Sequence, residues 1–75
     1  MSDERARWAG WQQAHQRALE ALQAAAQEYH RVVLDQAFAP DDPEARVRRQ
    51  QALRRLEELR ARLDEIREQQ PTWPR

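Results

Sequence analysis

A row of leucines runs through residues 45–70, whose sequence is ARVRRQQALRRLEELRARLDEIREQQ. Leu56, Leu59, Leu63 and Ile66 follow one another at alternating spacings of three and four residues, and Ala52 extends the row by one step. This spacing places all five side chains on one side of an α-helix, as in a helix that lies along another helix. The stretch therefore predicts one half of a helix pair, and the rest of the chain must supply the other half.

The first half of the chain carries a matching row. Asp3 to Phe38 consists mainly of Ala, Gln, Leu, Arg and Glu, which favour helix, with Ser2 as the expected N-cap. Gly10 is the weak point, at a cost of about 1 kcal/mol relative to Ala. The positions that repeat at the heptad spacing are Trp8, Trp11, His15, Ala18, Leu22, Ala25, Tyr29 and Val32.

A short break separates the two rows. Pro40 keeps its predecessor out of the helical conformation. Asp42, Pro43 and Glu44 provide an N-cap, a first helical residue and an acidic first turn. Because the connection is short, we expect an all-α fold, an antiparallel two-helix hairpin that resembles a coiled coil. The predicted segments of this single domain are a helix at about 3–38, a turn at 39–43, a helix at about 43–70 and a Pro/Trp tail at 71–75.

The register of the hairpin follows from the turn. If the turn centres between Pro40 and Asp41, opposed positions have numbers that add to about 81, as Leu22 and Leu59 do. Other opposed pairs in this register are Ala25 with Leu56, Tyr29 with Ala52, Ala18 with Leu63 and His15 with Ile66. The flanking charges agree, because the same register brings Glu28 near Arg55 and Asp35 near Arg48.

Three tryptophans gather at the open end in this register. Trp8 lies opposite Trp73, and Trp11 lies opposite Gln70. One interpretation is an aromatic clasp that holds the tail against the helices. The other is a docking surface for a partner, because Trp and Arg are enriched at interface hot spots. Trp8, Trp11 and Trp73, with Arg48 and Arg55 of the second helix, are therefore the candidate partner-binding residues.

A second apolar row lies beside the first. It consists of Leu19, Ala26 and Val33 in the first helix and Leu53 in the second. A lone hairpin would expose this surface, which monomers tend to avoid. We expect two hairpins to pair through it into a four-helix bundle, so that the protein is a homodimer. The alternative is that the same surface binds a helix of another protein.

His15 is the candidate for a pH-sensitive element. It occupies a predicted seam position opposite Ile66, where it can be a core histidine that hydrogen-bonds Gln70 or Gln12. Burial would favour the neutral imidazole, so that protonation would weaken the bundle as the pH falls. His30 lies beside the seam and is expected to be solvated. The two histidines lie too far apart along one helix to share a metal ion.

Composition narrows the function classes. The chain has 75 residues, no Cys, and thirteen basic against thirteen acidic residues, so it has no global attraction to nucleic acid. Every basic residue is Arg, which indicates a GC-rich coding genome and a bacterial or phage source. No apolar run approaches a membrane span, and the N-terminus does not resemble a signal peptide, so we expect a cytoplasmic protein.

No pattern in the sequence predicts catalysis, a cofactor or a metal site, and the acidic residues of the second helix alternate with Arg as on a solvated face. We therefore expect a non-enzymatic protein–protein interaction module, a small adaptor, chaperone or regulator. The alternative is a regulator that binds nucleic acid. Its candidate surface is the segment from Arg46 to Arg55, which holds five arginines and no acid.

Overall fold

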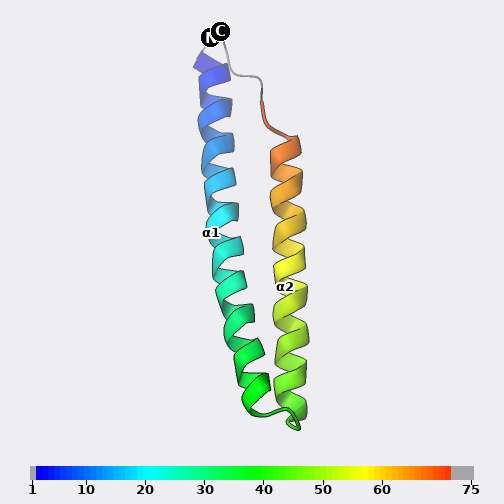
Figure 1. The fold of residues 1–75 in the computed structure, drawn as a ribbon. Coiled ribbons are helices and arrows are strands. Elements are labelled where there is room, and N and C mark those ends of the chain that lie inside the picture. The colour runs from blue at the N-terminus through cyan, green and yellow to red at the C-terminus, as the bar shows by residue number, and fades with distance from the viewer. Residues whose placement is uncertain (1, 72–75) are drawn as a thin grey trace.

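The computed structural model describes residues 2–71, which form two helices packed side by side (Figure 1). Helix α1 spans Ser2–Phe38 and helix α2 spans Pro43–Glu68, and the short turn between them reverses the chain. The predicted all-helical hairpin is confirmed. Ser2, expected as the N-cap, lies within the first turn of α1.

The turn is built by the residues that predict it. The backbone N–H of Asp42 donates to the carbonyl of Ala39 at 3.1 Å, which closes a four-residue turn with Pro40 at its second position. Asp42 has an extended backbone, and its Oδ1 accepts the N–H of Glu44 at 3.0 Å. Asp42 is therefore the N-cap of α2, and Pro43 follows it at the first helical position.

The far end of α2 is set by Pro71, which has no N–H to continue the helical ladder. The N–H of Gln70 donates to Arg67 and that of Gln69 donates to Ile66, both at 3.2 Å. These are i→i+3 bonds, so the end of the helix tightens. Helix α2 consequently ends two residues before the predicted position.

The core of the hairpin is thin. The buried apolar side chains of the described residues are Ala18, Ala25, Val32, Ala45 and Leu63. Ala45 is the least exposed of these, at 1%. Ala45 lies seven residues before Ala52 and so extends the row of Leu56, Leu59 and Leu63 by one heptad. The row predicted from the sequence began at Ala52. Three of these five residues are alanines, and the larger seam residues Leu22, Leu56 and Leu59 stay partly exposed.

The molecule is long and narrow, with extents of 60 × 14 × 13 Å. Its radius of gyration is 17.4 Å, whereas a compact domain of this length has one of about 11 Å. Its accessible surface is 6367 Å², whereas a compact protein of this mass exposes about 4,900 Å². The hairpin therefore presents far more surface than a globular monomer of the same size.

Cross-helix contacts report the register. Within residues 2–71, hydrogen bonds between the two helices link Trp11 to Ile66, Arg67 to His15, and Arg49 to Gln36. The two residue numbers in each pair add to 77, 82 and 85, respectively, and these sums lie on either side of the value of about 81 expected from the turn. The register is therefore close to the predicted one.

Neither of the two charge pairs expected beside the seam forms an ion pair among the described residues. Glu28 lines the same surface depression as Arg55, as expected, but it bonds Arg31 on its own helix at 2.6 Å. Arg48 lies 3.9 Å from both Asp42 and Glu44 instead of pairing with Asp35. In both cases the observed partner is near in sequence. Pairing with a nearby residue costs less side-chain conformational entropy than holding two long side chains together across the helices.

Candidate functional surfaces of the hairpin

A stack of three rings occupies the open end of α1. The ring centroids of Trp8 and Trp11 lie 5.5 Å apart, and those of Trp11 and His15 lie 4.9 Å apart with 22° between their planes. These residues follow the heptad row, so the helix itself brings the rings together on the side that faces α2. All three are half-buried. We call Trp8, Trp11 and His15 the aromatic stack.

Trp11 binds the end of the opposite helix. Its indole Nε1–H donates to the backbone carbonyl of Ile66 at 2.6 Å. In a regular helix that carbonyl would accept the N–H of Gln70, but here Gln70 donates to Arg67 because Pro71 cannot. Trp11 thus supplies a second donor to this carbonyl, which also accepts the N–H of Gln69 at 3.2 Å.

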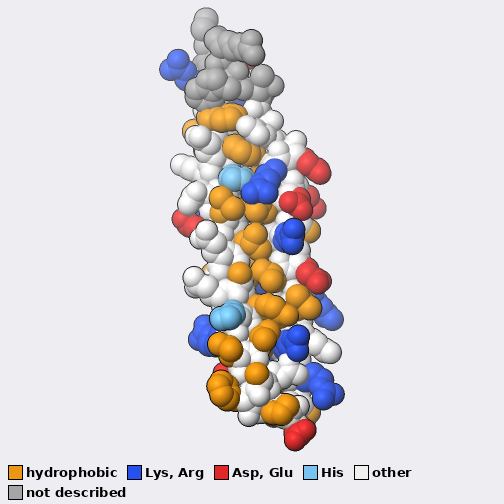
Figure 2. Space-filling view, in the orientation of Figure 1, with side chains coloured by type: hydrophobic (Ala, Val, Ile, Leu, Met, Phe, Trp, Pro, Cys, Tyr) orange, Lys and Arg blue, Asp and Glu red, His pale blue; other side chains and the backbone are white. Residues whose placement is uncertain are grey.

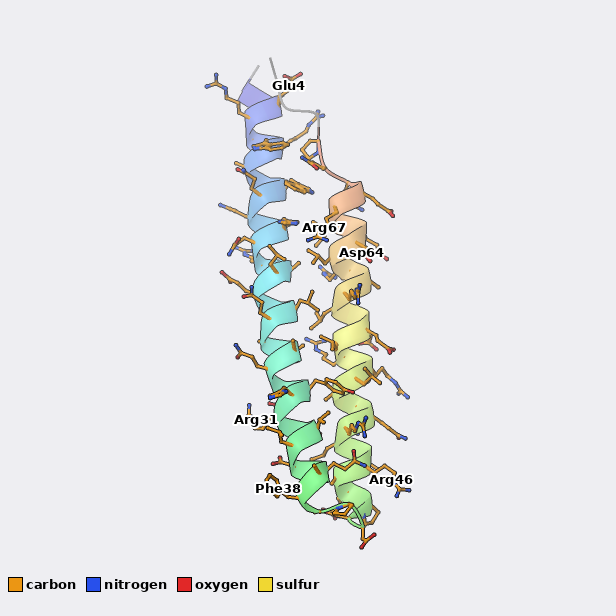
Figure 3. All side chains as sticks on the ribbon, viewed as in Figure 1. Glu4, Arg31, Phe38, Arg46, Asp64 and Arg67 are labelled. Atoms are coloured by element: carbon orange, nitrogen blue, oxygen red, sulfur yellow. The ribbon has the colours of Figure 1, made fainter. Side chains whose placement is uncertain are left out.

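His15 receives its hydrogen bond from α2. The Nε–H of Arg67 donates to His15 Nε2 at 3.4 Å, and Arg67 extends from α2 toward α1 (Figure 3). His15 therefore bonds a neighbouring side chain, as expected, but that neighbour is Arg67, whereas Gln70 and Gln12 were the examples named from the sequence. An imidazole nitrogen accepts a hydrogen bond only when it carries no proton. The contact thus requires Nε2 of His15 to be unprotonated.

The choice between an aromatic clasp and a docking surface depends partly on Trp73, which lies outside the described residues. Trp8 and Trp11 both pack within the hairpin and are not free side chains. Trp11 in particular joins the two helices, which is what a clasp requires. A docking role for the tryptophans stays a prediction.

The second apolar row lies at the surface. Leu53 is 38% exposed, Ala26 is exposed, and Leu19 and Val33 are half-buried. We call these four residues the Leu53 face. Leu53 also borders a surface depression of about 400 Å³, together with Gln36, Arg46 and Arg49. Figure 2 shows apolar side chains reaching the surface in a band along the length of the molecule.

The closed end exposes apolar side chains that the sequence analysis did not single out. Phe38 is 88% exposed, Leu34 is 47% exposed and Val47 is 50% exposed. Phe38 extends away from α2 at the last turn of α1 (Figure 3). Leu34 precedes Phe38 by four residues and so lies on the same side of α1. That spacing, outside the heptad row, is the signal that could have identified this pair.

Two of the five arginines in the segment from Arg46 to Arg55 have partners within the hairpin. Arg48 lies near two carboxylates, and Arg49 donates to Gln36 Oε1 at 3.0 Å. Arg46, Arg54 and Arg55 are exposed. Nucleic-acid binding by this segment stays a prediction, and a gel-shift titration with duplex DNA and RNA at low salt tests it.

Among residues 2–71, no group of three or more His, Asp or Glu side chains is placed to hold a metal ion. In the same part of the chain, neither helix combines the length and hydropathy that crossing a bilayer requires. No protein-family model, curated protein sequence or solved structure matches this chain.

Proposed function

We propose that this protein is a non-enzymatic protein–protein interaction module, a small adaptor, chaperone or regulator that works as a dimer of hairpins. The observation that carries the proposal is the accessible Leu53 face on a hairpin whose core is mostly alanine. Exposed apolar surface of this kind marks protein–protein contacts on soluble proteins.

The surface area of the hairpin supports association. Each chain exposes roughly 1,500 Å² more than a compact protein of its mass. A specific protein–protein interface buries about 1,200–2,000 Å² in total, counting both partners. Two hairpins therefore have enough excess surface to form such an interface without unfolding any part of either.

The position of the Leu53 face favours a four-helix bundle. Leu19 and Val33 project from α1 and Leu53 projects from α2, so the face draws on both helices. A two-fold contact between two such faces would place four helices around one core, in which Leu53 and Val33 add to the sparse apolar contacts of each hairpin. The depression beside Leu53 leaves room for a side chain of the second copy.

Sedimentation velocity on a pair of matched variants tests the proposal. Leu53→Glu places a charge in the Leu53 face, whereas Val47→Glu places the same charge at another exposed apolar position outside the face. We expect Leu53→Glu to sediment as a monomer, and Val47→Glu to sediment as a dimer like the unmodified protein. Circular dichroism checks that both variants keep their helices. If both variants keep the dimer, or both lose it, the Leu53 face is not the interface.

A further inference from the structure

A groove runs along the junction of the two helices through the small flank formed by Ala14 and Ala21. It consists of two depressions of about 340 and 230 Å³ that share Ala21 and Leu59 in their lining. From Ala14 to Glu28 it covers roughly 21 Å of α1, which equals about four turns of a helix laid along it.

The floor of the groove is apolar. Leu59 and Ile66 from α2 line it together with alanines of both helices, among them Ala18 and Ala52. Alanine side chains let another helix approach closely, since interaxial distance depends on the side chains at the contact. The floor thus suits the apolar side of an amphipathic helix.

The rim of the groove is basic. Arg17 lines it from α1, and Arg55 and Arg62 line it from α2. Among the described residues, none of these three arginines makes a hydrogen bond or an ion pair. Glu28 is the acidic residue of the lining, and it is already bonded to Arg31. The unpaired charges beside the groove are therefore positive.

We propose that this groove binds an amphipathic helix of another protein whose apolar side is flanked by Asp and Glu. Acidic flanks complement Arg17, Arg55 and Arg62, while the floor covers the apolar side. A two-fold contact between two such grooves is unfavourable, because it would oppose arginines to arginines. The proposal does not depend on the dimer, since none of the residues of the Leu53 face lines the groove.

Fluorescence anisotropy with synthetic peptides tests the proposal. The probe is a labelled helical peptide with Leu and Ala on one side and Glu on both flanks, and the comparison peptide carries Lys at every Glu position. We expect the Glu peptide to bind the full chain about tenfold more tightly than the Lys peptide, with an affinity that falls as salt is added.

Charge-reversal variants locate the binding. Arg55→Glu with Arg62→Glu should reverse the preference between the two peptides. Arg54→Glu with Arg60→Glu changes the net charge equally at positions that do not line the groove, and should leave the preference intact. Ala21→Phe should block both peptides by filling the groove. Circular dichroism checks the helicity of each variant.

Three results would overturn the proposal. The first is equal binding of the two peptides or binding of neither. The second is equal loss of binding in both charge-reversal variants, which would indicate a general charge effect. The third is displacement of the Glu peptide by duplex DNA, which would show that the arginines serve a nucleic acid.

Discussion

At the scale of single residues, Trp11 links the two helices more directly than any other side chain described. Its indole stacks on His15 within α1 and donates to the Ile66 carbonyl of α2. The same carbonyl also accepts the N–H of Gln69 in the last turn before Pro71, so Trp11 bonds the end of α2 where the helix stops. The stack and the helix end are therefore one unit.

Trp11→Phe tests the value of this hydrogen bond. The substitution keeps an aromatic ring but removes the N–H, so we expect the free energy of unfolding to fall by about 0.5–1.5 kcal/mol. Urea denaturation followed by circular dichroism measures the change. Trp11→Ala should cost more, because it also removes the ring. Equal stability of Trp11→Phe and the unmodified protein would mean that the bond contributes nothing.

His15 joins α1 to α2 through one hydrogen bond, in which its Nε2 accepts from Arg67. The pH-sensitive role expected for His15 stays a prediction.

At the scale of elements, the two helices are specified by different features. Helix α2 has a complete start signal, since Asp42 caps it and Pro43 opens it. Helix α1 is longer but contains Gly10, which lies at an exposed position in its first third. A Cβ added at Gly10 would meet nothing within 4 Å. Packing within the hairpin therefore does not require a glycine at position 10.

Gly10→Ala should stabilise the hairpin. Alanine fits the open space and loses less backbone entropy on folding, so we expect a gain of about 0.5–1 kcal/mol. Thermal unfolding at neutral pH measures it as a higher melting temperature. A lower melting temperature would show that position 10 contacts something that requires the bare backbone, such as a second chain.

At the scale of the whole molecule, the heptad rows and the Pro/Asp turn were enough to predict the hairpin and its approximate register. The periodicity could not predict which polar groups pair, because long side chains reach several neighbours: Arg67 took the place expected of Gln70 beside His15. It also gave no account of Phe38, which lies outside the rows and is almost wholly exposed. The candidate surfaces were thus predicted in part, and the groove rimmed by Arg55 and Arg62 was not.

We propose that two hairpins associate, because one hairpin alone has few fully buried side chains and a large accessible surface. Sedimentation equilibrium of the unmodified protein over a range of micromolar concentrations tests it most directly. We predict a mass of twice the 9.0 kDa chain that falls toward the single-chain mass only on dilution. A mass of one chain at every concentration in this range would contradict the account.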